Sequence, residues 1–450
     1  MKINLKGMKI IIAGAGAVGT HLAKLLSKEE QDIVLMDTDA DKLEELQSYN
    51  LMTFTGSPNS LKDLKEAGVK DCDLFIAVTP FESQNITACM LAANLGAAKT
   101  LARIDNYEYL QPENKEFFKK LGVDELIYPE MLAAQEIITA LKIAWVRQWF
   151  ELYGGALILL GVKIRENALI VNHRLSELSG GNQFYHVAAI KRKEKIIIPK
   201  GNDKILNDDL VYFTTTPDHI EEIRILSGKE YTKIKNVMIM GGSRIAIRTA
   251  DYAPDYMDIK IIETDPEKVN KIIEKVKGVG VIQGDGRDPE LLKEEGLSDC
   301  EAFIALTDSS EMNILACLNS KQYGVKKTIA EVENLTYIDT AETLNIGTVI
   351  NKKLIAASRI YQLLLASDVS NVKCMALANA EVAELVAKPG SKITQYPVKD
   401  LNLPKDLTIG GLVRNGVGMV VNGDTQIFPY DHVLVFCLDT AIKKIEKLFN

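Results

Sequence analysis

The two halves of this 450-residue chain repeat one another, and this duplication limits the fold more than any other feature of the sequence. Lys9–Gly19 corresponds to Asn236–Ala246 at a shift of 227 residues, and Ser60–Thr79 matches Asp288–Thr307 at a shift of 228. Internal self-similarity of this kind marks a duplicated folding unit. Each half is therefore expected to contain a complete domain of the same architecture.

Within the first copy, short apolar runs alternate with stretches that have helical spacing. The apolar runs predict buried parallel strands at Ile10–Ala13, Ile33–Met36, Leu51–Phe54, Leu74–Val78 and Thr100–Ile104. Val18–Ser27 predicts a helix, and Ser60 and its counterpart Asp288 are suited to cap later helices, with Pro289 at the first helical position. This alternation predicts, in each half, a parallel sheet covered by helices on both faces.

Each copy is followed by a long segment with helical spacing, Glu130–Phe150 in the first half and Lys352–Ala366 in the second. Beyond each segment lies a tail of short alternating strands, and the two tails match at a shift of 222, with a hairpin turn at Asn415-Gly416. The predicted fold class is α/β, with two tandem Rossmann-like parallel-sheet domains, each followed by a small β-rich α+β subdomain. The predicted domains cover residues 1–150, 151–228, 229–368 and 369–450.

The turn after the first strand carries the pattern G-x-G-x-x-G. Gly14 permits the tight turn, Gly16 lets the backbone approach a pyrophosphate, and Gly19 lets the helix pack closely on the strand. The phosphates would lie at the helix N-terminus, where free N–H groups and the helix dipole favour an anion. Asp37, 23 residues beyond Gly14, can bind both ribose hydroxyls and would repel a 2′-phosphate. The pattern favours NAD or NADH over NADP, and a glycine turn kept for packing alone explains Asp37 less well.

Other residues are expected at the same crevice. Val78 and Thr79 end the fourth strand, and the carboxyl ends of the strands border the ligand crevice in such sheets. Arg103 lies in the fifth strand, where a buried cation needs a partner. A bound phosphate, Asp105 or Asp37 could each be that partner. The sequence therefore does not decide whether Arg103 contacts a ligand or forms a structural ion pair.

The second copy departs from the glycine pattern. It keeps Gly241 but has Ser243 in place of the second glycine and an alanine in place of the third. Ser243 would crowd a pyrophosphate, although Arg244 could offset this by pairing with a phosphate. Glu263 replaces the aspartate, and Glu331 stands where the first half has an arginine. The second crevice is therefore expected to bind more weakly, to bind a different ligand, or to be empty.

Composition and motif content exclude several classes of function. With 53 basic and 61 acidic residues the net charge is −8, which argues against nucleic-acid binding. The longest apolar runs are far shorter than the ~20 residues that cross a bilayer, so any work at a membrane needs a partner. Neither the six cysteines nor the five histidines have metal-ligand spacing, and a G-x-x-x-x-G-K-[ST] loop is absent.

The tails copy each other, so neither is a dedicated substrate domain. We expect no enzyme activity; an NAD-dependent oxidoreductase with an unrecognised substrate is the alternative.

The arrangement closely resembles the TrkA-type regulatory subunits of bacterial Trk potassium uptake systems, which consist of tandem RCK (or KTN) domains. The resemblance covers essentially the whole chain and rests on KIIIAGAGAVG, Asp37, NVMIMGG, LFIAVT, FIALT and the two β-rich tails. It implies a cytoplasmic homo-oligomer, a dimer or tetramer that forms an RCK ring, peripheral on the inner face of the membrane. The expected partner is a TrkH-type potassium-translocating membrane subunit.

The resemblance also implies a ligand and its contacts. NAD(H), and in some members ATP or ADP, is expected to change the shape of the ring. The family's nucleotide contacts would fall on Gly14, Ala15, Gly16, Ala17, Val18, Asp37, Val78, Thr79 and Arg103. Equivalent positions in the second half start at Gly241 and Glu263, where the altered glycines weaken the expectation.

Overall fold

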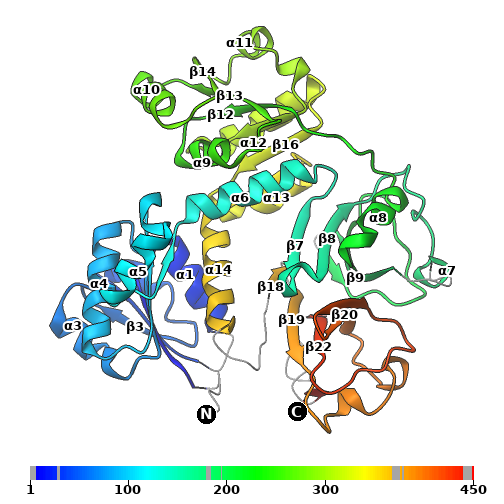
Figure 1. The fold of residues 1–450 in the computed structure, drawn as a ribbon, viewed down its shortest axis with the longest axis horizontal. Helices are drawn as coiled ribbons and strands as arrows, with labels where there is room; N and C mark the ends of the chain where they lie inside the picture. The colour runs from blue at the N-terminus through cyan, green and yellow to red at the C-terminus, as the bar shows by residue number, and fades with distance from the viewer. Residues whose placement is uncertain are drawn as a thin grey trace.

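The part of the chain that the structure describes contains four β-sheets, two parallel and two antiparallel, with two long helices at the centre (Figure 1). The computed structural model describes residues 7–27, 31–178, 184–193, 195–366, 375–377, 380–438 and 448–449. The expected domain boundary near residue 368 lies outside the described residues.

The first parallel sheet has six strands in the order β3-β2-β1-β4-β5-β6. Its strands are β1 (Lys9–Ala13), β2 (Asp32–Asp37), β3 (Met52–Thr55), β4 (Leu74–Ala77), β5 (Thr100–Arg103) and β6 (Glu125–Ile127). Its helices are α1 (Ala17–Leu26), α2 (Ala40–Glu44), α3 (Leu61–Glu66), α4 (Glu82–Leu95) and α5 (Pro112–Lys120). This is the Rossmann order, in which the chain reverses direction across the sheet between β1 and β4 and leaves a ligand crevice there. The five predicted strands are confirmed, and β6 is additional.

The second parallel sheet repeats the first, in the order β14-β13-β12-β15-β16-β17. Its strands are β12 (Asn236–Met240), β13 (Asp258–Glu263), β14 (Gly280–Gln283), β15 (Ala302–Ala305), β16 (Lys327–Glu331) and β17 (Thr348–Ile350). Its helices are α9 (Arg244–Tyr252), α10 (Pro266–Lys275), α11 (Pro289–Glu294), α12 (Ser310–Gln322) and α13 (Ile338–Thr343). Ser60 caps α3 and Asp288 caps α11, as the sequence predicts. The duplication therefore extends to strand order and to helix caps.

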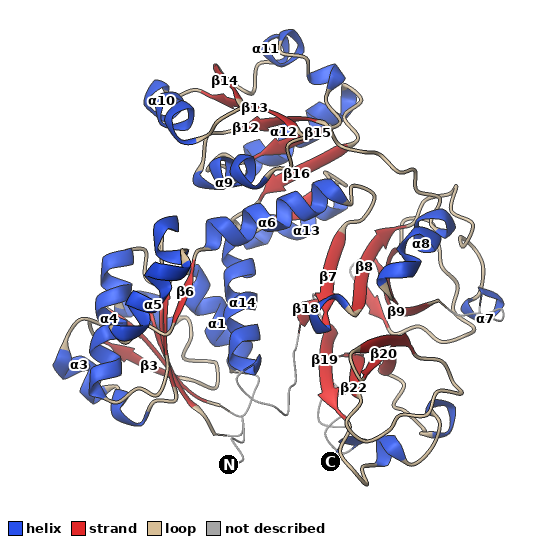
Figure 2. Ribbon diagram, in the orientation of Figure 1, coloured by secondary structure: helices blue, strands red, loops and turns tan. Residues whose placement is uncertain are grey.

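The two tails fold as five-stranded antiparallel sheets of identical connectivity, which lie against each other (Figure 2). The first contains β7 (Gln148–Leu152), β8 (Leu157–Lys163), β9 (Tyr185–Arg192), β10 (Lys195–Ile197) and β11 (Leu210–Thr215), with helices α7 (Leu175–Leu178) and α8 (Ile220–Leu226). The second contains β18 (Met375–Leu377), β19 (Ala380–Val386), β20 (Leu407–Arg414), β21 (Val417–Val420) and β22 (His432–Leu438). The ion pair Arg192–Asp209, with a buried carboxylate, recurs as Arg414–Asp431 at the predicted shift of 222.

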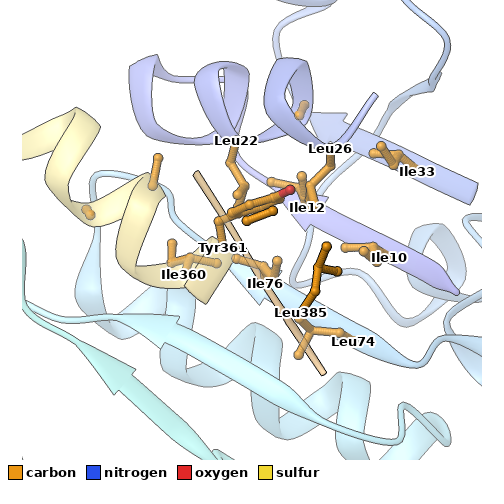
Figure 3. Close-up of a cluster of buried hydrophobic side chains, with 14 of the residues drawn as sticks. Ile10, Ile12, Leu22, Leu26, Ile33, Leu74, Ile76, Ile360, Tyr361 and Leu385 are labelled. Carbon is orange, nitrogen blue, oxygen red and sulfur yellow. The ribbon is translucent and has the colours of Figure 1, made fainter. Parts of the chain in front are cut away.

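The two central helices, α6 (Pro129–Lys142) and α14 (Lys352–Ala366), each cross to the opposite half of the molecule. Ile137 and Leu141 of α6 belong to the core of the second Rossmann domain, beside Ile245 of α9. Ile360 and Tyr361 of α14 belong to the core of the first, and Figure 3 shows Tyr361 beside Leu22 of α1. The two helices also pack on each other. Helix α6 of the first half therefore covers α9 of the second half, and α14 of the second half covers α1 of the first. Both α1 and α9 begin at a glycine turn.

The predicted helix Glu130–Phe150 is wrong at its C-terminal end. The helix stops at Lys142, Ile143 leaves helical geometry at φ −119° and ψ 62°, and Trp149 and Phe150 lie in strand β7. The aromatic residues favour a strand, and an apolar run by itself does not separate a helix from the strand that follows it. The second predicted helix, Lys352–Ala366, is confirmed. Among the described residues, no helix is long and apolar enough to cross a membrane.

Candidate nucleotide-binding site

The first glycine corner lies between β1 and α1, and its three glycines stand in different surroundings. Gly14 has φ +111°, and a Cβ there would lie 3.0 Å from the backbone nitrogen of Thr79. A Cβ on Gly19 would lie 1.9 Å from the carbonyl oxygen of Gly14. A Cβ on Gly16 would meet no atom within 4 Å. The fold therefore requires glycine at 14 and 19, whereas the open space at Gly16 is free for a ligand.

Helix α1 presents free hydrogen-bond donors toward this space. Gly16 is its N-cap, with no side-chain cap and no acidic residue in the first turn. The first hydrogen bond of the helix runs from the Thr20 N–H to the Gly16 carbonyl oxygen at 2.8 Å, so the N–H groups before Thr20, including those of Ala17 and Val18, have no partner within the helix. Together with the helix dipole, these groups form a site for an anion such as a phosphate.

The Asp37 carboxylate holds the glycine loop at the end of β2. Its Oδ2 accepts a hydrogen bond from the Ala15 N–H at 2.7 Å, and its Oδ1 accepts one from the Asp39 N–H at 3.0 Å. Lys42 Nζ lies 3.9 Å from Oδ1. An ionised carboxylate has about four acceptor sites, so both oxygens can still accept hydrogen bonds from ribose hydroxyls. The geometry fits a sugar acceptor that also positions the phosphate loop.

The ends of β4 and β5 are joined by a buried asparagine to which the sequence analysis assigned no role. Asn85 Oδ1 accepts a hydrogen bond from the Thr79 hydroxyl at 2.7 Å, and its Nδ2 donates to the Arg103 carbonyl oxygen at 2.9 Å. Asn313 makes the corresponding bonds in the second half. The signal that could have found it is a polar residue retained in both copies of a buried helix face. Val78 is buried, with Cγ2 at 3.3 Å from the position of a Gly19 Cβ.

Arg103 pairs with Asp105, one of the partners that the sequence left open. Its Nη2 lies 3.6 Å from Asp105 Oδ1, and its buried Nε has no hydrogen-bond partner among the residues that the structure describes. The other oxygen of Asp105 lies 3.2 Å from Nη1 of Arg244, in the glycine turn of the second half. One carboxylate therefore connects the edge of the first crevice to the turn of the second.

The second crevice keeps part of the same framework. Gly241 has φ +100°, and Glu263 Oε2 accepts a hydrogen bond from the Gly242 N–H at 2.7 Å, as Asp37 does in the first half. The pKa of Glu263 is lowered: burial by itself would raise it, but hydrogen bonds from the N–H groups of Asp265 and Gly242 outweigh burial, together with the Thr264 hydroxyl and the charge of Lys268. The hydroxyl of Ser243 accepts a bond from the Ala246 N–H at 3.4 Å. This cap uses a donor that an anion at α9 would need.

A cavity of about 550 Å³ lies over the second crevice, and both halves line it. The first half contributes Tyr107, Tyr128 and Glu130 to this lining. The glycine motif of the second copy could not predict these residues, because they belong to the other half. Six basic side chains line the cavity: Arg244, Arg248, Lys268, Lys271, Lys275 and Lys352. Lys352 Nζ lies 3.2 Å from Glu331, the residue that replaces the arginine of β5. The second crevice thus has a different charge arrangement from the first. No cluster of residues able to hold a metal ion occurs in the described part of the chain.

The structure thus has two Rossmann sheets with glycine corners, two antiparallel subdomains and two crossed helices. These features define a class of proteins with tandem domains of the Rossmann fold. Comparison with protein families is specific: the TrkA-N domain model matches residues 10–129 and 237–352, and the TrkA-C domain model matches residues 159–227 and 382–450. The chain belongs to the TrkA family.

Relatives match along almost the whole chain. The Trk system potassium uptake protein TrkA of Halomonas elongata is 31% identical over 98% of this chain and 99% of its own length. The protein of the same name from Vibrio alginolyticus is 32% identical over 98% and 99%. Among solved structures, the GsuK RCK domain has a TM-score of 0.60 at 13% identity, covering 100% of this chain and 96% of that chain. The GsuK channel bound to NAD has a TM-score of 0.59 at 14% identity, covering 100% and 80%. At these identities the structures show the shared fold.

Proposed function

We propose that this protein is a non-catalytic, nucleotide-sensing regulatory subunit that gates a TrkH-type potassium-translocating membrane subunit. NAD or NADH binds in the first crevice, and ATP or ADP competes for it. The proposed contacts are Gly14, Ala15, Gly16, Ala17, Val18, Asp37, Val78, Thr79 and Arg103, with Gly241 and Glu263 at the second crevice. Relatives named as Trk potassium uptake proteins and a neighbouring channel bound to NAD support this assignment.

The observation that carries the proposal is that each of the two central helices, α6 and α14, packs on the other half of the molecule. α14 lies on α1, which starts at the first glycine corner, and α6 lies on α9, which starts at the second. Asp105 lies between Arg103 and Arg244 and adds an electrostatic connection to this packing. A ligand at the first corner therefore touches elements whose positions are set by both halves.

Gating follows from competition for Arg103. A phosphate group that approaches Arg103 competes with Asp105, which then pairs more strongly with Arg244. A ligand shifts a conformational equilibrium only by its differential affinity for the two states. A coupling free energy of ~1–3 kcal/mol is typical and changes the populations of the two states about 5- to 150-fold. The relative position of the two Rossmann domains is the variable that we propose the membrane subunit senses.

The proposed assembly follows the family resemblance. The protein forms a homo-oligomer, a dimer or tetramer that makes an RCK ring, and lies in the cytoplasm on the inner face of the membrane. It binds no nucleic acid, in keeping with its net charge of −8. We propose residues 1–150, 151–228, 229–368 and 369–450 as its four folding units.

The experiment that tests the site is calorimetric titration of NADH into the wild type and the Asp37→Ala variant. We expect at least tenfold weaker binding in the variant, because hydrogen bonds to a charged group contribute about 1.5–3 kcal/mol each. The matched control is Glu263→Ala, which removes the same loop contact from the second half and leaves the tighter site unchanged. Equal affinity in wild type and Asp37→Ala would contradict the assignment. Consumption of NADH in the presence of carbonyl compounds would instead favour the oxidoreductase.

A further inference from the structure

A second, smaller cavity lies away from both nucleotide crevices, where the first antiparallel subdomain meets the second Rossmann domain. Its volume is about 220 Å³. Its lining comes from the segment between α6 and β7, from the C-terminal end of β8 and the residues after it, from the segment between α8 and β12, and from α12, β16 and the turn before β17. We refer to it as the cationic cavity, because its lining includes the basic residues Arg147, Lys163, Arg165, Lys229, Lys321, Lys326 and Lys327.

The positive charge of the cationic cavity is poorly compensated. Among the residues that the structure describes, Glu230 is the one acidic residue in the lining. Arg165 pairs with Asp208, but across the described ranges none of the other six cations has a carboxylate oxygen within 4.0 Å. Several of them instead donate hydrogen bonds to neutral groups, such as Lys321 to the Asn345 carbonyl oxygen and Arg147 to the Asn345 side chain. Unpaired cations in a partly desolvated space are unfavourable, and an anion between them would offset that cost.

Lys327 shows how the cavity is built across the boundary between the two units. Its side chain is buried at the start of β16, and its Nζ donates hydrogen bonds to the carbonyl oxygens of Ala144 at 3.3 Å and Val146 at 3.0 Å. These carbonyls belong to the segment between α6 and β7. The second Rossmann domain therefore contacts the first half through a buried cation that lines the cavity.

The protonation of these lysines reflects the crowding of charge. Burial, together with the charges of Arg147 and Lys321, lowers the pKa of Lys327 to about 7. The pKa of Lys229 is lowered to about 8, first by burial and then by the charges of Arg165, Arg147 and Lys163. Burial, then Arg147 and Arg165, lowers the pKa of Lys321 to about 8. A bound anion favours the charged form of each lysine and would raise these pKa values, so binding near pH 8 would take up protons.

We propose that the cationic cavity binds a small free anion with one or two phosphate groups and thereby fixes the first antiparallel subdomain against the second Rossmann domain. The volume decides the size of the ligand, since sites for drug-sized molecules occupy about 300–1,000 Å³. Lysine and arginine side chains that converge on one space provide charge-assisted hydrogen bonds to phosphate oxygens. This inference does not rest on the nucleotide crevices, because none of its residues lines them.

The test is calorimetry with inorganic pyrophosphate and with inorganic phosphate on the full chain, at constant ionic strength and with NADH saturating. We expect one pyrophosphate per chain and, at pH 8, proton uptake that appears as a dependence of the heat on the buffer. The double variant Lys229→Gln, Lys321→Gln should bind at least tenfold more weakly and show smaller proton uptake, since only Lys327 remains of the three lysines whose pKa values are lowered to about 7 or 8. The matched control, Lys119→Gln with Lys120→Gln, removes two exposed lysines at the end of α5 that line neither cavity, and should bind within threefold of wild type.

Two further variants keep the result interpretable. Lys326→Gln changes an exposed side chain of the same lining, so a loss of affinity there is not a loss of folding. Lys229→Arg keeps the charge and should retain binding. Absence of pyrophosphate binding in wild type, or an equal loss in the control pair, would overturn the proposal. Binding of phosphatidic acid vesicles without binding of free pyrophosphate would overturn it as well, because the ligand would then be a lipid headgroup.

Discussion

Two glycines three residues apart in the first glycine corner are expected to respond in opposite ways to one added methyl group. A Cβ at Gly19 would lie 1.9 Å from the Gly14 carbonyl oxygen and 3.3 Å from Cγ2 of Val78. A Cβ at Gly16 would meet nothing within 4 Å, and the residue has φ −74°, which any amino acid adopts. Gly19→Ala should therefore damage the fold, and Gly16→Ala should damage the binding of nucleotide.

The magnitudes follow from these contacts. Overpacking of this kind costs about 1–3 kcal/mol, and the 1.9 Å approach to a backbone atom puts Gly19→Ala at the upper end. The better helix propensity of alanine returns about 1 kcal/mol, so a net loss of roughly 2 kcal/mol is expected. For Gly16→Ala, the entropy gained by restricting the unfolded chain, about 0.4–1 kcal/mol, is offset by a poorer N-cap. Its stability should stay within about 0.5 kcal/mol of wild type.

The assay pairs thermal unfolding, followed by circular dichroism, with calorimetric titration of NADH. Gly19→Ala should lower the unfolding midpoint of the first Rossmann domain by on the order of 5 °C. Gly16→Ala should keep the midpoint but bind NADH at least tenfold more weakly, a change of about 1.4 kcal/mol. The reasoning is refuted if Gly16→Ala binds NADH as tightly as wild type, or if Gly19→Ala is as stable as wild type.

Two changes in the antiparallel subdomains give further predictions. Asp431→Ala leaves the partly buried Arg414 without its bidentate partner and should cost about 3 kcal/mol of unfolding free energy, whereas Asp424→Ala at an exposed site should leave the urea midpoint unchanged. Burial lowers the pKa of His186, which contacts the Thr408 hydroxyl at 3.0 Å, to about 4. Because the folded pKa lies below the unfolded value of 6.5, stability is present above pH 6.5 and is lost as the pH falls toward 4. Between pH 7 and 5 the loss should be about 2 kcal/mol in wild type and absent in His186→Gln, as measured by urea unfolding at each pH.

The repeat was sufficient to predict both Rossmann sheets. Parallel strands that are buried on both faces are continuous apolar runs, and glycine, serine and aspartate mark the turns and caps between them. Residues such as Asp288 have their effect within a few positions of the chain, which is why the sequence reveals them. The hairpin at Asn415-Gly416 is confirmed for the same reason, since both residues have the positive φ that its turn requires.

The crossing of α6 and α14 could not be predicted from the sequence. The apolar face of a helix shows that something covers it, but it does not identify what does. Ile137 and Ile360 have the same periodicity whether they pack on their own domain or on the other one. The wrong extension to Phe150 has a related cause, because the aromatic residues that end the apolar run belong to the next strand.

The same distinction between local and tertiary features applies to the candidate site. The glycine corner and Asp37 are local to one strand–turn–helix unit, so spacing predicts their arrangement. The contact from Asp105 to Arg244 joins residues 139 positions apart in different domains, and it exists only because the crossed helices bring the two halves together. The lining of the cationic cavity likewise comes from positions far apart in the chain, between Ala144 and Gly347, and none of its residues belongs to a motif.

Potassium flux into proteoliposomes that contain a TrkH-type membrane subunit together with this protein tests whether the first crevice is the sensor. We expect NADH to change the flux severalfold with wild type and to leave it unchanged with Asp37→Ala, while Glu263→Ala retains the response. If NADH changed the flux equally with wild type and Asp37→Ala, or with neither, the first crevice would not be the sensor.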